Sequence, residues 1–546
     1  MKNRLLSLFA FICFLGVFAQ DDMPIVWETK APHKINFNGT GTEDRGYSYV
    51  ASAKEISIFA NETGRIKWTK AFKELAPNLK KIDELIPFWE SNTIFLFDRK
   101  MGKDQIACID METGGLLWST DRYQNVTDEN VVYIPERQGF AISLKDKLVF
   151  IKVSNGEEIW STAQFGGVVG KYVYTNDGYL VTVNFQPSGL VALFTGFKNM
   201  IAKIDMDNGD IVWSNTYIGR AERKVISKEF LYDIVVEESR VILRLNGIQI
   251  YDYNTGANQW SAAFNFTPEG VRRRPSNARK WGVYGAVADP VFVKETNDLY
   301  VLDMSNKKNQ YVKKYDANTG KMIWTSPEIK GARAIPGMYV VEDKVICQIG
   351  GIVEFQAYLQ IKSGDYTYYV WKVYFDNVKP NGLQAFNTKD GSLVWESEKF
   401  KKGITNAYVY ENTILCSSGK ELYKIDYNDG SEMYSVPVTA GGVGVAVGIM
   451  PYKDKMIVIG EKGISAYTPA DGKFLYSGKY KSSTLEDVID DVLIMKTDKA
   501  DIASFDLDSG KFTVFKAKTG ASTTLTTDGK FVYIYEDKVF TKVKTQ

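Results

Sequence analysis

The chain has 546 residues, of which 67 are Lys or Arg and 66 are Asp or Glu, so its formal net charge is +1. With this balance, no global electrostatic field favours binding to nucleic acid or to an anionic membrane. The length permits a large hydrophobic core, and no segment beyond the N-terminal region is apolar for long enough to span a bilayer.

Residues 1–19 have the pattern of a signal peptide. Lys2 and Arg4 supply the charged start, an apolar run follows, and Val17-Phe18-Ala19 gives a cleavage site before Gln20. The apolar run is too short to cross a membrane. We therefore expect an exported protein. No C-terminal sorting domain is visible, which favours the periplasm over secretion or attachment to the outer membrane.

One short phrase recurs ten times in the rest of the chain. It consists of an Asp or Asn, a few loop residues ending in Gly, and an aromatic residue four positions later. The aromatic positions, preceded by the isolated Trp27, are Trp68, Trp118, Trp160, Trp213, Trp260, Trp324, Trp395, Tyr434 and Tyr476, with Phe515 one place late in the tenth copy. Units that repeat every ~40 to 70 residues stack as propeller blades or solenoid turns.

Each phrase predicts a β-hairpin. Apolar residues alternate in Gln105–Asp110 before Gly114 and continue in Leu116–Trp118 after it. Alternation at period two is typical of strands, and the Asp–Gly chemistry between them is typical of a tight turn. Two further strand-like runs precede each phrase. Four antiparallel strands per unit predict an all-β fold, a β-propeller whose recurring aromatic ring docks each blade against the next.

The two ends of the chain predict a closed ring. Ile25-Val26-Trp27 is an outer strand with no three strands before it, whereas three strands after Phe515, ending near Lys542, lack a fourth. Pairing the ends completes one blade and removes an open sheet edge. The count is about 11 blade-equivalents, which leaves open whether the chain forms one wide ring or two.

Three units are longer than the others. The spacing of the aromatic positions is 53 residues before Trp213, 64 before Trp324 and 71 before Trp395, against 39 before Tyr434. Because binding residues often lie on loops held by a rigid frame, we expect partner-binding hairpins or loops near 184–200, 264–285 and 350–380. The candidate side chains are apolar, basic or aromatic: Leu193, Phe194, Arg272, Arg273, Arg274, Trp281, Tyr366, Tyr368, Tyr369 and Trp371. In the alternative interpretation these segments only cover the propeller, and the basic one is a solvated loop.

Few residues suggest catalysis. His33 is the only His and is expected in a surface loop, which argues against a Ser-His-Asp triad and leaves a Ser-Lys pair or a carboxylate dyad open. Cys108, Cys347 and Cys416 fall in predicted strands, which favours buried free thiols over disulfides. Asp205–Asp210 resembles a calcium loop, but the same positions carry the hairpin turn in the other copies, and we interpret it as a turn.

The phrase as it stands in Asp316 to Trp324 resembles the tryptophan-docking repeat of pyrroloquinoline-quinone (PQQ)-like propellers, and the resemblance extends over essentially the whole chain after the leader. That family includes calcium- and PQQ-dependent dehydrogenases, non-catalytic scaffolds such as the outer-membrane barrel-assembly propeller of bacteria, and ligand-sensing domains. The enzymes typically have adjacent cysteines, an Asp base or a His base, and some have a Cys-x-x-Cys-His haem site. This sequence has no adjacent cysteines and no such haem motif.

We therefore expect an exported, non-catalytic propeller without a cofactor, which binds an envelope protein or a saccharide. The alternatives are a PQQ- and calcium-dependent oxidoreductase and a saccharide-binding surface protein.

Overall fold

The fold was determined from a computed structural model of the chain. It describes residues 21–546 except 34–36, 44, 100–103, 128–129, 145–146, 164, 166–167, 186–199, 218–232, 238, 246, 264–270, 305–308, 364–365, 439–441, 481–482, 490, 498–500, 519–520 and 537. The leader predicted at residues 1–19 lies outside the described residues.

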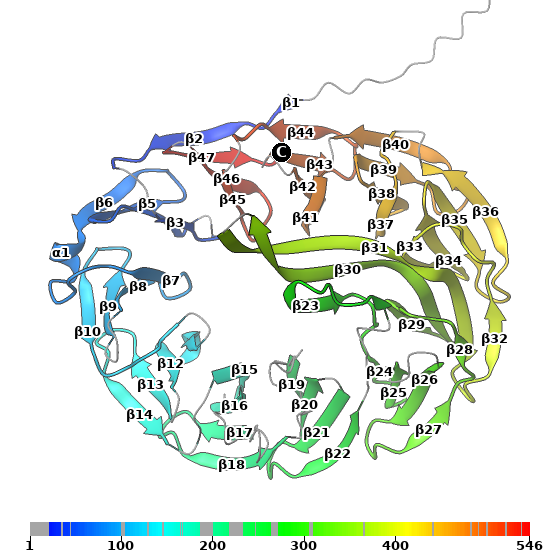
Figure 1. Cartoon of the computed structure of the whole chain (residues 1–546), viewed down its shortest axis with the longest axis horizontal. Coiled ribbons are helices and arrows are strands. Elements are labelled where there is room, and N and C mark those ends of the chain that lie inside the picture. Colours follow the sequence, from blue (N-terminus) through cyan, green and yellow to red (C-terminus); the bar gives the residue numbers. More distant parts are fainter. Residues whose placement is uncertain are drawn as a thin grey trace, which may run out of the picture.

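Eleven four-stranded antiparallel blades follow one another around a single ring (Figure 1). The first five blades are β3 (Phe37–Thr40), β4 (Tyr47–Ala51), β5 (Glu55–Ala60) and β6 (Ile66–Ala71); β7 (Glu84–Phe88), β8 (Thr93–Asp98), β9 (Gln105–Asp110) and β10 (Leu116–Thr120); β11 (Val131–Ile134), β12 (Gly139–Ser143), β13 (Leu148–Lys152) and β14 (Glu158–Thr162); β15 (Val168–Tyr174), β16 (Tyr179–Phe185), β17 (Met200–Asp205) and β18 (Ile211–Thr216); and β19 (Asp233–Glu237), β20 (Arg240–Leu245), β21 (Gly247–Asp252) and β22 (Asn258–Ala263).

The next five blades are β24 (Val291–Val293), β25 (Asp298–Asp303), β26 (Asn309–Asp316) and β27 (Met322–Thr325); β29 (Gly337–Val341), β30 (Lys344–Ser363), β31 (Tyr366–Asn387) and β32 (Leu393–Glu396); β33 (Ile404–Tyr410), β34 (Thr413–Ser418), β35 (Glu421–Asp426) and β36 (Glu432–Pro437); β37 (Ala446–Tyr452), β38 (Lys455–Gly460), β39 (Gly463–Tyr467) and β40 (Phe474–Lys479); and β41 (Ser483–Ile489), β42 (Val492–Thr497), β43 (Ile502–Asp506) and β44 (Phe512–Phe515).

The eleventh blade contains both ends of the chain. It consists of β45 (Ser522–Leu525), β46 (Phe531–Glu536), β47 (Val539–Lys544) and β2 (Ile25–Lys30), with β2 antiparallel to β47. Figure 1 shows this blue-on-red pairing at the top of the ring. The predicted fold class, the closure by the two ends and the count of eleven are confirmed, and the open choice is settled as one ring.

Three strands and two short helices stand outside this scheme. β1 (Asp21–Asp22) pairs with β44, β23 (Ala278–Tyr284) with β30, and β28 (Ile329–Lys330) with β26. The helices are α1 (Phe72–Leu75) and a 3-10 turn at Pro135–Arg137. None of the helices in the described chain has the length and hydropathy needed to traverse a lipid bilayer.

The hydrophobic core lies between blades. One cluster joins Phe95 and Phe97 of the second blade to Phe140 and Ile142 of the third, and all four side chains are fully buried. The rings of Phe95 and Phe140 meet edge to face, with their centroids 4.9 Å apart. Since each sheet buries its faces only against its neighbours, closing the ring leaves no blade with an uncovered face.

Eight successive pairs of blades are joined by the same contact, which we call a lock. The indole Nε1 of an outer-strand Trp donates a hydrogen bond of 2.8–3.0 Å to a backbone carbonyl in the turn of the next blade. The donors are Trp27, Trp68, Trp118, Trp160, Trp213, Trp260, Trp324 and Trp395. Each indole also lies against the Gly of that turn, where an added Cβ would come within 3 Å of the ring. The turn Gly is therefore needed both for its positive φ and for the close approach of the ring.

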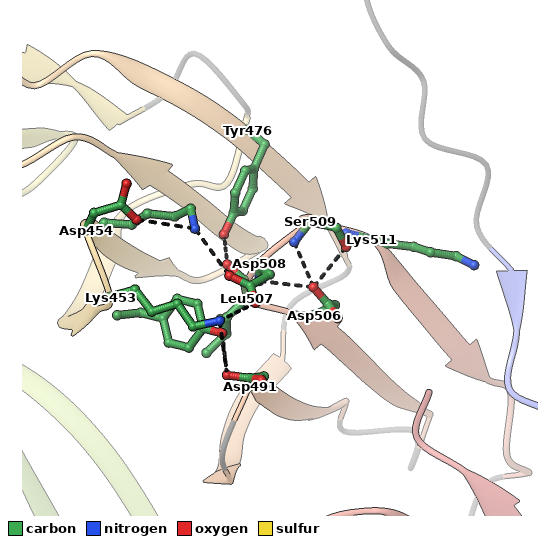
Figure 2. Close-up of polar contacts among 11 residues, drawn as sticks. Lys453, Asp454, Tyr476, Asp491, Asp506, Leu507, Asp508, Ser509 and Lys511 are labelled. Carbon is green, nitrogen blue, oxygen red and sulfur yellow. Dashed lines mark hydrogen bonds and ion pairs between the residues drawn. The ribbon is translucent and has the colours of Figure 1, made fainter.

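Tyrosine replaces tryptophan at the next two locks. The Tyr434 hydroxyl donates to the carbonyl of Pro469 at 3.0 Å, and the Tyr476 hydroxyl donates to that of Leu507. Figure 2 shows the second of these, where Lys453 also pairs with Asp508 across the same junction. Asp506 shapes the receiving turn, because its Oδ1 accepts from the backbone N–H of Asp508 and of Ser509. Ion pairs thus reinforce a lock that lacks an indole.

The eleventh junction, between β44 and the shared blade, has a different construction. There β1 runs parallel to β44, and the Met23 side chain is buried among Ile494, Val532 and other apolar residues of both blades. The Thr545 hydroxyl donates to the carbonyls of Gly529 and Lys530, and its own carbonyl accepts from Thr513 of β44. Both chain ends therefore cross the seam that closes the ring.

Candidate interaction surface

Two of the three long segments that were predicted to bind partners lie side by side in the structure. The basic segment that contains Arg272, Arg273, Arg274 and Trp281 lies beside the aromatic hairpin of β30 and β31. For Tyr366, Tyr368, Tyr369 and Trp371 the structure places the backbone in β31 and does not describe the side chains. Leu193 and Phe194, in the third departure, lie outside the described residues.

We call the three-stranded unit formed by β23, Gly351–Ser363 of β30 and Tyr366–Val378 of β31 the arm. β30 pairs with β31 along the whole hairpin, and β23 pairs antiparallel with the other side of β30 from Glu354 to Leu359. At about 3.3 Å per residue, Gly351–Ser363 extends roughly 40 Å. In the view of Figure 1 the arm is drawn across the middle of the ring, with its end toward β3 and β45.

A bend separates the arm from its blade. The register of β30 against β31 shifts between Ile349 and Gly351, and Gly350 and Gly351 both have positive φ. A Cβ on Gly350 would lie 1.8 Å from the carbonyl oxygen of Pro380, so no other residue fits there without moving the backbone. A β-bulge of this kind re-aims a strand, and here it directs the hairpin away from the sheet of its own blade.

The arm has a hydrophobic core of its own. Val353, Phe355 and Ala357 of β30 are buried, and Trp281 and Val283 of β23 pack against them. The same cluster contains Ala334 and Val378, which attaches the base of the arm to the blades. Since a two-stranded hairpin is marginal in water, the third strand and this core give the arm its stability.

Arg272 links the basic segment to the hairpin. Its guanidinium forms an ion pair with Asp376 and lies 5.0 Å from the ring of Phe355 and 4.9 Å from that of Tyr374. Arg272 is therefore a structural residue of the arm and not a free cation. In the alternative interpretation this segment was a solvated loop; residues 273–277 are indeed irregular and mostly exposed, whereas 278–284 form a strand and Arg272 is held by the hairpin.

The neighbouring candidates differ from Arg272. Arg274 donates through Nη2 to the carbonyl of Ala278 at 2.7 Å, which ties the loop to the start of β23. Arg273 is exposed. Trp281 is half-buried, and its Nε1 is buried without a hydrogen-bond acceptor among the described residues. Arg274 is exposed as well, so both of these arginines differ in burial from the half-buried Arg272.

The arm is strongly basic although the chain is neutral. Residues 272–284 and 351–379 contain eight Lys or Arg and three Asp or Glu, which gives +5, whereas the whole chain is +1 and the remainder is therefore −4. Exposed cations at Arg273, Lys372 and Lys379 contribute to this charge. The arm thus presents a basic surface on a weakly acidic ring.

The described residues offer no metal centre. They contain no group of three or more His, Cys, Asp or Glu side chains that could hold an ion. In the former calcium candidate, Asp205 Oδ1 accepts from the backbone N–H of Asp207, and Asn208 Oδ1 accepts from that of Asp210, as in a hairpin turn. The side chains of Asp205 and Asn208 are therefore used to shape the turn.

The three cysteines considered for reactivity are buried, and His33 lies within hydrogen-bonding distance of another side chain. Cys108, Cys347 and Cys416 are buried free thiols, as predicted, and burial raises the pKa of each. His33 is half-buried and its Nε2 lies 3.0 Å from the Ser57 hydroxyl. A thiol with a raised pKa is a poor nucleophile, so these cysteines have the character of core residues.

Sequence reasoning missed that β23 belongs to the hairpin. Trp281, Val283 and Tyr284 are residues that favour a strand, but Arg279 and Lys280 beside the arginine cluster favoured the interpretation of a loop. Its pairing with β30 joins residues that are far apart in the chain, and no local pattern predicts such a partner.

Comparisons with known proteins agree with this architecture. A family profile described as outer membrane protein assembly factor BamB matches residues 17–262 and 379–532, almost three quarters of the chain. The unmatched residues between these ranges include the described basic segment, the whole arm and the sixth blade. A comparison with curated protein sequences gives no match.

A comparison with solved structures finds several that are similar to this chain. BamB from Moraxella catarrhalis has 14% identity and a TM-score of 0.28, covering 69% of this chain and 90% of its own. The designed Ika8 protein has 11% identity and a TM-score of 0.35, covering 72% and 100%. The C-terminal WD40 domain of Sif2 has 8% identity and a TM-score of 0.37, covering 77% and 98%. These TM-scores are below 0.5, so family membership rests on the profile alone.

Proposed function

The chain belongs to the family of PQQ-like repeat propellers described as outer membrane protein assembly factor BamB, and from this membership we propose that it is a non-catalytic scaffold of the bacterial envelope. The ring acts as a rigid frame, and the arm binds another envelope protein. Export through the N-terminal leader to the periplasm is part of the same proposal.

The observation that carries the proposal is the position of the arm. The family profile covers ring segments on both sides of residues 263–378, and this unmatched range contains the whole arm together with the sixth blade and β29. An added three-stranded unit with its own core, aromatic sequence and net charge of +5 is not needed to close the ring. Aromatic and Arg side chains dominate the energetics of protein interfaces, which supports a docking role for the arm.

The first test shortens the arm. Val353 and Asp376 are paired neighbours, so Glu354–Phe375 is replaced by Asn-Gly, a turn that joins two such strands. Tagged protein is incubated with an envelope extract, and the retained proteins are identified. We expect the full chain to retain a specific envelope protein and the shortened variant to lose it.

A matched control removes apolar surface elsewhere. Met322 and Ile323 are 49% and 48% exposed on the rim of the ring, and changing both to Ser is expected to leave partner recovery unchanged. Circular dichroism checks that every variant keeps its sheet content. Equal recovery by the shortened variant would show that the arm is not the docking surface.

A separate test addresses catalysis. The sequence has no adjacent cysteines, and the described residues provide no carboxylate cluster suited to calcium. We expect calorimetric titration with PQQ and Ca²⁺ to give no binding heat and dye-coupled assays with alcohols and sugars to give no turnover. Tight binding followed by turnover would establish an oxidoreductase and overturn the scaffold proposal. A glycan array separates protein binding from saccharide binding.

A further inference from the structure

One long strand edge of the arm is open. Tyr366–Val378 of β31 pair with β30 on one side, while β32 pairs only with Gln384, Ala385 and Phe386 at the base of the hairpin. No strand in the described chain pairs with the other side of Tyr366–Val378. The backbone N–H and C=O groups along such an edge are a template for another strand.

This edge differs from the others in the molecule. Among the described residues, ten of the outermost blade strands are also unpaired on one side, and the other, β44, pairs there with β1, but all eleven are only four to six residues long. On β23, the opposite edge of the arm, the N–H and C=O of Ala278 already bond to Pro275 and Arg274. Tyr366–Val378 contains no proline and a single lysine, the residues that usually protect an edge.

From the open edge and the charge of the arm we propose that Tyr366–Val378 of β31 is a strand-addition site for an extended acidic segment of a partner protein. The proposal rests on the scaffold function above and states how its partner is held.

Two observations select this occupant. A polypeptide strand supplies donors and acceptors at the spacing of the β31 backbone, which neither a polysaccharide nor a nucleic acid does. The arm has a net charge of +5, and the exposed Lys372 and Lys379 lie on β31 itself. Acidic side chains on the added strand would meet these cations, whereas a basic strand would be repelled.

The nearby acidic residue does not cancel this preference. Asp376 is on the same strand, but its carboxylate is engaged by Arg272. The pair adds no net charge, so the field along the edge comes from Lys372 and Lys379. The position of Arg272 against Phe355 and Tyr374 also holds the strand in place.

The test uses a defined probe with the full chain. A fluorescent twelve-residue peptide of three Glu-Val-Thr-Val repeats is titrated at 0.15 M salt, alongside a version with Lys in place of Glu. We expect the acidic peptide to bind at least ten-fold more tightly than the basic one. The double variant Lys372→Glu/Lys379→Glu is expected to lose at least ten-fold in affinity for the acidic peptide, and Lys321→Glu, an exposed site on the ring, to lose little.

Hydrogen exchange separates strand addition from simple attraction of charges. Amides in Tyr366–Val378 are expected to gain protection when the acidic peptide, or the partner retained by the full chain, is bound. Binding that leaves these amides unprotected, or no difference between the two peptides, overturns the inference.

The two proposals fail in distinguishable ways. If shortening the arm abolishes partner recovery while the retained partner leaves Tyr366–Val378 unprotected, the scaffold function stands and strand addition is wrong. If the shortened variant retains the partner as well as the full chain does, the scaffold function of the arm fails first.

Discussion

Each docking residue acts on two features of the following blade at once. The Nε1 of Trp395 donates to the carbonyl of Tyr427 at 2.9 Å, and the same ring covers Gly430, whose φ is +74°. The hydrogen bond fixes the position of the indole, and the missing side chain of the Gly makes room for it. The turn residues thus bind the indole of the previous blade and also close their own hairpin.

Gly430→Ala tests this double role. The substitution places a Cβ 2.5 Å from the ring of Trp395 at a positive φ, and we expect a loss of stability of at least about 2 kcal/mol. Gly331 has a similar φ of +68° with no atom within 4 Å of the added Cβ, so Gly331→Ala should lose only about 1 kcal/mol. Urea denaturation measures both. Equal losses would mean that the indole does not press on the turn.

The tyrosine locks differ from the tryptophan locks in that they ionise. Burial, followed by the charge of Asp471, raises the pKa of Tyr434 to about 12, and its hydroxyl donates to Pro469. The folded pKa is above the ordinary value of 10, so the contribution of Tyr434 is complete below pH 10 and is lost as the pH rises toward 12.

Tyr434→Trp removes this dependence on pH. Tryptophan fills the equivalent site in eight other blades and has no ionisable group in this range. We expect the variant to lose less stability than the parent between pH 10 and 12, measured as the difference in melting temperature at each pH. Parallel curves for the two proteins would show that this lock does not govern the alkaline response.

At the level of elements, the ring is closed by its ends and not by an eleventh aromatic lock. Phe515 comes one place late in its repeat and packs in the apolar cluster of the seam, where Met23 is 3% exposed. β1 adds a parallel pairing to β44 at the same junction. Neither terminal segment closes the seam alone, because one supplies β1 and β2 and the other supplies β45 to β47.

Met23→Ala is expected to weaken this seam. Removing a buried Met side chain from a packed cluster costs about 2–4 kcal/mol, whereas Met322→Ala, at a 49% exposed position, should cost almost nothing. Hydrogen exchange should show faster exchange in β44 to β47 of the Met23 variant than in the other blades. A uniform change around the ring would contradict a local seam.

The sequence predicted the elements that depend on local chemistry. The Asp–Gly turns and the aromatic positions identified the repeated hairpins, and the incomplete blades at the two ends identified the closure. It did not decide between one ring and two, because every blade contacts only its neighbours and the choice depends on small rotations summed over eleven junctions. It also missed β23 as the third strand of the arm, since Trp281 and Phe355 come together only in the folded chain.

For the candidate site, the sequence identified the segments but did not predict that they pack against each other. The cluster of Arg272, Arg273 and Arg274 was visible as a departure from the repeat, but nothing in it indicated that Arg272 binds Asp376. The open edge of β31 follows from tertiary pairing alone. Residue types thus predicted a binding region, and the register of the strands was needed to say how it could bind.

At the scale of the whole molecule, the ring and the arm divide the work. The ring is built of eleven four-stranded blades and has a remainder charge of −4, while residues 272–284 and 351–379, which form the arm and its basic segment, carry +5. The base of the arm is fixed to the ring through Gly350 and Ala334, so under the proposed function the open strand is held in a defined direction before it binds a partner. Pre-organisation of this kind lowers the entropy lost on binding.

Site-specific photo-cross-linking in intact cells tests the central claim most directly. A photoreactive residue is placed at Lys372 in the arm or at Lys321, an exposed position on the ring. The account predicts that the arm position cross-links to one envelope protein and that the ring position does not. Cross-linking of the same protein from Lys321 alone, or from neither position, would contradict it.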